Sequence, residues 1–176
     1  MKLVKTWKNI KIYVNTNADS IKAGQELMNA YVSKNKKDIK INSFGKPYLA
    51  NNRLYFNISH TKDYACLAVS SCEEVGVDIE RCDRQVDYRT IMLSRFNIQY
   101  LNRIGNSVAF IKEWTIRESA IKCYGDLTLN SIYGVETYRN ILKCDGKPDL
   151  EYHVFRYENT YICVTRKLVE HKKTKK

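Results

Sequence analysis

Apolar residues in the first half of the chain recur with a helical period and then with a strand period. The segment ADSIKAGQELMNAYVSK places Ala23, Leu27 and Tyr31 on one stripe, which predicts a helix that begins near Ser20, a favourable capping residue. The segment RLYFNIS then alternates apolar and polar side chains, and the turn HTKD leads into a second apolar segment, YACLAVS. Two such segments joined by a short polar turn predict a β-hairpin with His60 at its bend.

A third strand is predicted from EVGVDIE, at residues 74–80. Side chains alternate between the two faces of a strand. One face therefore carries apolar residues and the other carries a glycine and two carboxylates: Val75, Val77 and Ile79 against Gly76, Asp78 and Glu80. Both carboxylates point the same way, and the glycine leaves space beside them.

The second half contains one long predicted helix. It begins at Ser107, has Ile111, Trp114 and Ile121 as a core stripe, and reaches a typical stop at Gly125. Residues 84–106 indicate helix without a clear period, and the remainder up to residue 165 is typical of short strands rich in Tyr and Val.

Two Gly-Lys-Pro triplets indicate that the halves are related. They begin at Gly45 and Gly146, and each precedes strand-like sequence with a similar ending, DYACLAV and TYICVT. We therefore predict an α+β fold of two similar lobes, a pseudo-duplication in which each lobe is a small, mostly antiparallel sheet packed with a helix. The expected division is an N-terminal lobe at 1–80, a C-terminal lobe at 81–165 and a basic, flexible tail at 166–176.

Composition places the chain among globular proteins, because 44% of its 176 residues are hydrophobic and 28% are charged. No apolar run approaches the ~18 residues of a membrane span, and the basic N-terminus lacks the apolar stretch of a signal peptide. We expect a cytoplasmic, monomeric protein with no membrane partner. The six cysteines form no C-x-x-C pair, so reduced buried thiols are favoured over a disulfide framework or a zinc cluster.

The formal charge of +11 is concentrated at the two ends. Residues 166–176 carry six basic residues and one acid, residues 1–12 carry four lysines, and the body between them holds 20 basic against 18 acidic residues. Solvated ends and attraction of an acidic partner are both compatible with this distribution. No recognition motif favours nucleic acid, so a nucleic-acid-binding protein is a distant alternative.

Candidate chemistry lies in three carboxylates and one lysine. Glu118 and Lys122 are four residues apart and share one face of the predicted helix. Taken alone, this pair resembles an ordinary ion pair on a helix surface. Asp78 and Glu80, taken alone, are typical of the solvent-exposed face of a strand. His60 alone resembles a polar turn residue. Together, however, three carboxylates are a hard-oxygen set suited to Mg²⁺, and a neighbouring lysine suits a phosphate.

The ordered motifs carry a resemblance to a known family. G-K-P, then F-N-I-S-H, then G-V-D-I-E, then W-x-x-x-E-S-x-x-K resembles the 4′-phosphopantetheinyl transferases, in the larger, two-lobed type that activates surfactin synthetase. The matched blocks span roughly residues 20–125. The resemblance implies transfer of the phosphopantetheine arm of coenzyme A to a serine of an acyl or peptidyl carrier protein of fatty acid, polyketide or nonribosomal peptide biosynthesis, with release of 3′,5′-ADP.

The resemblance also implies roles for single residues. Asp78, Glu80 and Glu118 would hold Mg²⁺ (or Mn²⁺), with Glu118 as the candidate base and Lys122 steadying phosphate charge. Residues that match family positions in contact with coenzyme A are Lys46, Ser59, His60, Asp78 and Lys122, and Lys22 is a possible substitute for basic residues that relatives carry before the first helix. Arg117 stands where the family usually has lysine. A non-catalytic relative that binds coenzyme A or a carrier is the main alternative.

The resemblance implies an acidic carrier partner, and residues 84–106 are the candidate docking surface. This segment mixes apolar and arginine side chains, among them Leu93, Phe96, Tyr100, Arg89 and Arg95. A helix that simply covers the second sheet is the alternative interpretation.

Overall fold

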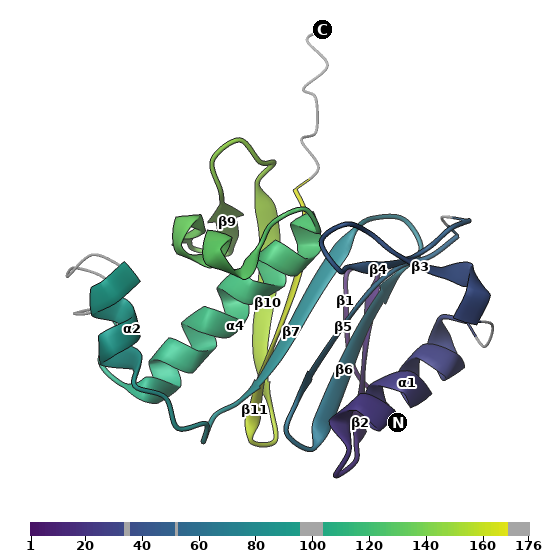
Figure 1. Cartoon of the computed structure of the whole chain (residues 1–176), viewed down its shortest axis with the longest axis horizontal. Helices are drawn as coiled ribbons and strands as arrows, with labels where there is room; N and C mark the ends of the chain where they lie inside the picture. The colour runs from purple at the N-terminus through teal and green to yellow at the C-terminus, as the bar shows by residue number, and fades with distance from the viewer. Residues whose placement is uncertain (34–35, 52, 96–103, 169–176) are drawn as a thin grey trace, which may run out of the picture.

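The computed structural model describes residues 1–33, 36–51, 53–95 and 104–168 (Figure 1). The first sheet has the strand order β1-β2-β6-β5 and is antiparallel throughout. Its strands are β1 (Lys2–Trp7), β2 (Ile10–Thr16), β5 (Tyr55–Thr61) and β6 (Tyr64–Ser70). A short two-stranded sheet, β3 (Ile39–Ile41) with β4 (Pro47–Leu49), and the 3₁₀ turn Lys36–Asp38 connect the helix α1 to β5.

The second sheet has the order β7-β11-β10-β9-β8 and is also antiparallel. Its long strands are β7 (Val75–Arg81), β10 (Leu150–Tyr157) and β11 (Thr160–Lys167), and its short ones are β8 (Glu136–Tyr138) and β9 (Ile141–Lys143). The helices are α1 (Ser20–Tyr31), α2 (Tyr88–Arg95) and α4 (Ser107–Tyr124), and a 3₁₀ turn, Leu129–Gly134, follows α4.

The two halves repeat one order of elements. β2 is followed by α1, a short β-hairpin and the β5–β6 hairpin. After β7 come the additional helix α2 and then α4, a short β-hairpin and the β10–β11 hairpin. In each sheet the first strand of the repeat pairs with the last, since β2 pairs with β6 and β7 pairs with β11. The predicted α+β pseudo-duplication is therefore confirmed. The hairpin β1–β2, which the sequence analysis did not predict, adds an edge strand to the first half alone.

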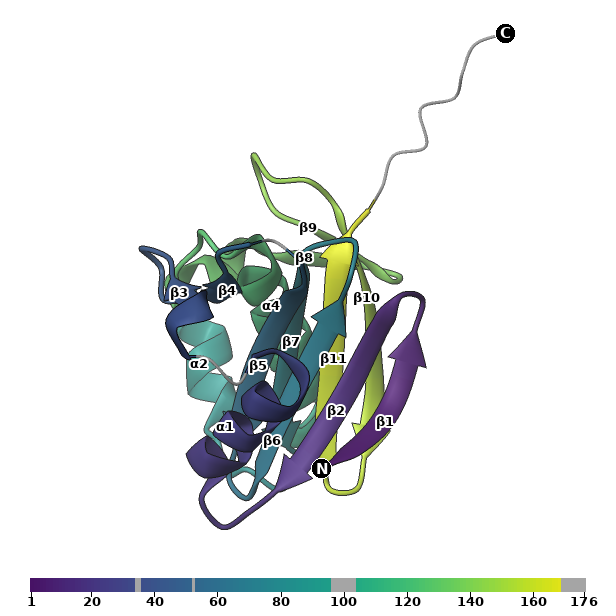
Figure 2. The same cartoon turned by 90° about the vertical axis from the view of Figure 1, so that its right-hand side faces the viewer.

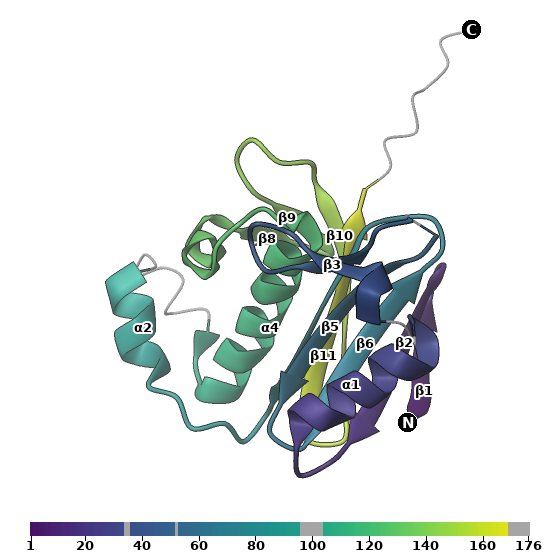
Figure 3. The same cartoon turned by 45° about the vertical axis from the view of Figure 1, so that its right-hand side comes forward.

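The layers are arranged helix, sheet, sheet, helix (Figures 1 and 3). Between the sheets lie apolar side chains of four strands, and α1 and α4 each cover the opposite face of their own sheet. Figure 2 shows α1 in front of the first sheet, with β1 and β2 continuing that sheet away from β5. The fully buried residues between the sheets include Ile10, Ile12, Val77 and Ile162.

The predicted first helix is confirmed, but its cap is Asp19 rather than Ser20. The carboxylate of Asp19 accepts hydrogen bonds from the backbone N–H groups of Ile21 and Lys22, which otherwise have no partner inside the helix. Ala23 and Leu27 are fully buried against the first sheet, as their spacing predicts.

The helix α4 begins and ends where the sequence predicts. Asn106 caps its first turn, and Gly125 ends it with a φ of 72°, a left-handed conformation that glycine adopts without penalty. Most sides of the helix are covered, because Ile116 and Ala120 pack on the second sheet while Phe110 and Ile111 pack beside α2. The predicted stripe therefore describes only part of its buried surface.

Two predicted boundaries differ from the observed elements. β7 lies almost wholly before the expected division at residue 80 yet pairs with β11 in the second sheet, and the division into lobes itself stays a prediction. The start predicted for the basic tail, residue 166, differs from the structure. β11 continues to Lys167, and Arg166 forms ion pairs with Glu73 and Glu151. Residues 169–176 lie outside the described residues.

The basic N-terminus is not a frayed end. Its lysines lie in the β1–β2 hairpin, where Lys8 forms an ion pair of 2.5 Å with Glu151 of the second sheet. The cysteines are free thiols, and two of them depart from the expected burial, since Cys72 is exposed and Cys144 is half-buried.

None of the described helices is long and apolar enough to cross a membrane. A cytoplasmic location and a monomeric state stay predictions.

The segment proposed for carrier docking is described only in part. Within α2, Met92 is buried beside Phe110 of α4, whereas Leu93 is exposed. The buried side of the helix thus packs on the first turns of α4, and Tyr161 of β11 in the second sheet packs against the same cluster. Phe96 and Tyr100 lie outside the described residues.

Gly76 fixes how closely α4 approaches β7. A Cβ atom at this position would lie 2.5 Å from the backbone nitrogen of Cys123 and 2.7 Å from Thr165 Oγ1, and closer still to the carbonyl oxygen of Ser119. We expect Gly76→Ala to lower the free energy of unfolding by about 1–3 kcal/mol, because the helix has to move away from the strand.

Chemical denaturation measures this change. Gly134→Ala is the matched control, because a Cβ there meets nothing within 4 Å. Equal unfolding free energies for the two variants would contradict the close contact.

Candidate active site

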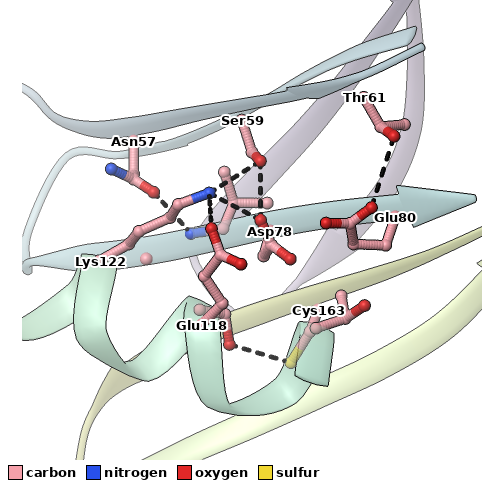
Figure 4. A network of polar contacts seen from close by, with 12 residues as sticks. Asn57, Ser59, Thr61, Asp78, Glu80, Glu118, Lys122 and Cys163 are labelled. Atoms are coloured by element: carbon pink, nitrogen blue, oxygen red, sulfur yellow. Dashed lines mark hydrogen bonds and ion pairs between the residues drawn. The ribbon is translucent and has the colours of Figure 1, made fainter. Parts of the chain in front are cut away.

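The candidate site lies where the edge strands β5 and β7 meet beneath α4 (Figure 4). Asp78 stands in the middle of β7, Ser59 comes from β5, and Glu118 and Lys122 project from the C-terminal half of α4. The two sheets are joined here through a side chain, since Asn57 Oδ1 accepts a hydrogen bond of 2.9 Å from the backbone N–H of Val77. Residues from both halves of the chain therefore build one polar cluster.

The helix α4 lies so close to β7 that no side chain fits between them, and a hydrogen bond from the neighbouring strand β11 holds it there. Thr165 Oγ1 donates to the carbonyl oxygen of Ser119 at 2.8 Å, and Gly76 lies directly beneath. Because Ser119 follows Glu118, this contact sets the distance between the helix carboxylate and Asp78 two residues along β7.

Asp78 is almost fully buried, with 1% of its surface exposed. Its Oδ1 atom accepts hydrogen bonds from Ser59 Oγ at 2.8 Å and from Lys122 Nζ at 2.6 Å. Its Oδ2 atom is buried and has no hydrogen-bond partner among the described residues. A buried carboxylate oxygen without a partner is costly, so Asp78 Oδ2 would gain from a ligand that binds here.

The other two carboxylates are partly satisfied. Glu118 accepts a hydrogen bond of 2.8 Å from Trp114 Nε1 and pairs with Lys122 at 3.2 Å. Glu80 pairs with Arg84 at 2.6 Å and accepts a longer bond of 3.4 Å from Thr61.

The charges of the cluster oppose one another. Burial raises the pKa of Asp78, the Lys122 ammonium opposes that rise, and Glu118 and Glu80 add to it. Burial also raises the pKa of Glu80, against the effect of Arg84. Burial by itself lowers the pKa of Lys122. Asp78 and Glu118 raise it by more than burial lowers it, so the lysine stays charged. Three carboxylates therefore lie around the single ammonium group of Lys122.

The three carboxylates fit a divalent cation. Asp78, Glu80 and Glu118 each offer one oxygen, and these atoms lie within 4.8 Å of one another. Carboxylate oxygens are ligands that Mg²⁺ prefers. Asp78 Oδ2 is buried and has no hydrogen-bond partner among the described residues, so it is available to such an ion.

A cavity of about 220 Å³ adjoins the cluster between the two halves. Its lining includes Lys122, Asn57 and Lys46. Lys46 reaches it from the loop before β4, and its ammonium contacts Glu74 at 2.7 Å and the carbonyl oxygen of Cys123 at 3.2 Å. Two lysines thus face one cavity beside the carboxylates.

Two predicted residues are not brought into the cluster. His60 is exposed on β5 and alternates with Ser59, so it faces the α1 side, where Ile58 and Met28 line a separate hollow with it. Lys22 is exposed in the first turn of α1. The four N-terminal lysines lie in the β1–β2 hairpin. In the first sheet β1 and β5 are opposite edge strands, so this hairpin lies away from the cluster.

Several residues of the site were missed by sequence reasoning. Asn57 and Thr61 share the alternation of Ser59 along β5, and that pattern could have found them. Trp114 was assigned only to the core stripe, although its spacing of four from Glu118 permits the observed hydrogen bond. Arg84 lies beyond the end of β7, where no regular period applies.

Arg117 points away from the site. It is 2% exposed, pairs with Glu113 at 2.9 Å, and donates to the backbone carbonyl oxygens of Ile132 and Val135. The arginine therefore holds the 3₁₀ turn after α4, and it does not act on a phosphate in the cluster.

Removal of the Lys122 ammonium is expected to destabilise the fold in a pH-dependent way. At pH 8, Lys122→Met should lower the free energy of unfolding by about 3–5 kcal/mol, because Asp78 becomes a buried charge without a cation. Above the ordinary Asp pKa of 3.8, Asp78 of the unfolded chain has released its proton, whereas in the folded variant burial keeps the proton on Asp78. Stability is therefore lost as the pH rises above that value and regained as it falls.

Urea denaturation between pH 4 and pH 8 tests this dependence. Lys112→Met, at an exposed position of the same helix, is the control. A loss in Lys122→Met that is the same at every pH, or that grows in acid, would contradict the buried pair.

Comparisons with known proteins agree with the motifs. No protein-family model matches the chain. It is 34% identical over 89 residues to the 4′-phosphopantetheinyl transferase gsp of Aneurinibacillus migulanus, a match that covers 48% of this chain and 36% of that protein. It is 31% identical over 99 residues to the L-aminoadipate-semialdehyde dehydrogenase-phosphopantetheinyl transferase of Xenopus laevis, covering 46% of this chain and 33% of that protein.

The chain thus matches about a third of the length of each of these curated relatives. Within that stretch, the resemblance to the 4′-phosphopantetheinyl transferase superfamily that the ordered motifs predict is confirmed.

Proposed function

We propose that the chain transfers the 4′-phosphopantetheine arm of coenzyme A to a serine of an acyl or peptidyl carrier protein, with Mg²⁺ and with release of 3′,5′-ADP. The observation that carries this proposal is the cluster of Asp78, Glu80 and Glu118 around Lys122, with a buried carboxylate oxygen that has no partner in the described part of the chain. The similarity to two phosphopantetheinyl transferases supports the same reaction.

Asp78, Glu80 and Glu118 would hold Mg²⁺, which when bound neutralises charge on the pyrophosphate of coenzyme A. Mn²⁺ has the same preference for carboxylate oxygens and is a possible substitute. Lys122 and Ser59 offer a charged and a neutral donor at the edge of this cluster, suited to phosphate oxygens.

The proposed reaction is a displacement at phosphorus. The serine oxygen forms a bond to the phosphorus that carries pantetheine, the bond from that phosphorus to the bridging oxygen breaks, and 3′,5′-ADP leaves with that oxygen. The proton of the serine passes to the carboxylate of Glu118, directly or through water. Such a reaction needs mainly positioning and neutralisation of charge.

Trp114 and Lys122 would set the geometry of Glu118. The indole N–H holds one carboxylate oxygen at 2.8 Å, and the ammonium lies 3.2 Å from the other. Two donors fix the carboxylate plane, so the base keeps one orientation toward the incoming hydroxyl. His60 and Lys22, on the α1 side of β5, are proposed to contact more distant phosphate groups of coenzyme A.

We expect transfer to require a divalent ion and to fall at least about 100-fold in kcat/KM in Asp78→Ala and in Glu118→Ala, because each variant leaves phosphate charge without compensation. Mass spectrometry of apo carrier proteins incubated with coenzyme A and Mg²⁺ measures the reaction. Glu136→Ala, at an exposed position of β8, is the control.

Normal turnover by both site variants in folded form would refute the site. A wild-type chain that binds coenzyme A but modifies no carrier in a panel of acyl and peptidyl types would instead be a non-catalytic relative.

Lys122 and His60 are expected to affect different kinetic constants. Lys122→Ala should lower kcat more than it raises the KM for coenzyme A if the lysine acts on charge that develops during transfer. His60→Ala should mainly raise the KM for coenzyme A if the imidazole only binds a phosphate. Steady-state kinetics on variants shown to be folded by circular dichroism measures both, and the reverse pattern would exchange the two roles.

A further inference from the structure

The C-terminal end of α4 needs partners from outside the helix. The last four carbonyl groups of an α-helix have no hydrogen-bond donor within it, and they carry the negative end of the helix dipole. Gly125 supplies one donor, since its N–H bonds the carbonyl oxygen of Ile121 at 2.9 Å. The carbonyl groups of Cys123 and of Gly125 itself face the first half of the chain.

Two side chains of the first half meet these carbonyl groups. Asn42 Nδ2 donates to the oxygen of Gly125 at 2.6 Å, and Lys46 Nζ donates to the oxygen of Cys123 at 3.2 Å. The side chain of Lys46 is only 11% exposed, and Glu74 holds its ammonium at 2.7 Å. A partly buried cation at a helix C-terminus is stabilising because it opposes the helix dipole.

The turn that carries these donors is fixed by its own hydrogen bonds. Asn42 Oδ1 accepts from the backbone N–H groups of Phe44 at 3.0 Å and of Lys46 at 2.9 Å, and the turn joins the paired strands β3 and β4. The stem of Lys46 lies against Gly125, where an added Cβ atom would be 2.6 Å from Lys46 Cδ. One asparagine thus orders the turn and binds the helix at the same time.

We infer that Asn42 and Lys46 form a clamp between the halves that positions α4, and with it Glu118 and Lys122, over Asp78. Lys122 directly precedes Cys123, so a shift of the last turn moves the ammonium relative to its carboxylate. Lys46, which the family resemblance assigns to coenzyme A, is in this inference a positioning residue whose ammonium is already bound by protein oxygens. The catalytic consequence rests on the proposed transferase function, whereas the effect on α4 does not.

The second Gly-Lys-Pro triplet provides a matched comparison. Its Lys147 pairs at 2.6 Å with Asp126, whose side chain is half exposed, and it bonds no helix carbonyl in the described contacts. The same triplet therefore has different partners in the two halves, and Lys147→Met is a control for Lys46→Met.

Hydrogen exchange measured by NMR tests the clamp without any assay of activity. Asn42→Asp keeps the oxygen that orders the turn but replaces the donor with a negative group facing the helix end. We expect the amides of residues 123–125 to exchange about tenfold faster in Asn42→Asp and in Lys46→Met, and the amides near the start of α4 to keep their rates. Lys46→Arg should restore slow exchange, and Lys147→Met should not change it.

Unchanged exchange at the end of α4 in both clamp variants would overturn the inference. Should either variant fail to fold, the other and Lys46→Arg still decide the question.

Steady-state kinetics then separates positioning from phosphate binding. A positioning role predicts that Lys46→Met lowers kcat about tenfold with less than a threefold change in the KM for coenzyme A, since a displaced Glu118 affects transfer more than binding. An increase in that KM with unchanged kcat would make Lys46 a phosphate ligand and overturn the positioning role. If the wild-type chain transfers nothing, the proposed function fails while hydrogen exchange still decides whether the clamp exists.

Discussion

The ion pair between Lys122 and Asp78 is the interaction on which the arrangement of this protein depends. It joins a helix of the second half to the strand at the junction of the two sheets, in a place where Asp78 has 1% of its surface exposed. A carboxylate buried to this extent requires compensation, and Lys122 provides it only if α4 lies close to β7. Gly76 permits that approach, and the 2.8 Å bond from Thr165 to Ser119 maintains it. Packing and charge therefore demand the same position of the helix.

The duplication explains why the site lies between the halves. Each half buries its own helix on one face of its sheet and shares the other face with its partner. The edge strands β5 and β7 then meet, and their polar side chains point into a space that neither half closes alone. The halves differ in what they bring, since the second supplies the carboxylates and Lys122 while the first supplies Ser59, Asn57 and the turn at Asn42.

Polar groups at this junction serve both structure and proposed chemistry. Asn57 uses its side-chain oxygen to replace a missing backbone partner of Val77, and it also lines the cavity of about 220 Å³ beside Lys122. Trp114 is half buried near α2, yet its N–H reaches Glu118. Because each of these side chains has a second function in packing, their orientations are fixed before any ligand binds.

The sequence by itself determined the local structure and the chemical character of the site. Alternation along EVGVDIE placed Asp78 and Glu80 on one face of a strand, and the spacing of Glu118 and Lys122 placed both on one face of a helix, because these periods are properties of the backbone. The ordered motifs also indicated a resemblance to the 4′-phosphopantetheinyl transferases, and two such transferases match about half of the chain.

Only the tertiary structure decided which of these faces meet. The N-terminal hairpin was not predicted, although Ile10, Ile12 and Val14 alternate with polar residues as in a strand; what the tertiary structure decided is that their apolar face packs against the second sheet. Arg117 matches a family position in sequence but points to the carbonyl groups after α4, since one residue along a helix turns the side chain by about 100°. Lys46 likewise follows the motif, yet its partners at the end of α4 lie 77 residues away in sequence, and no local pattern can specify a contact at that separation.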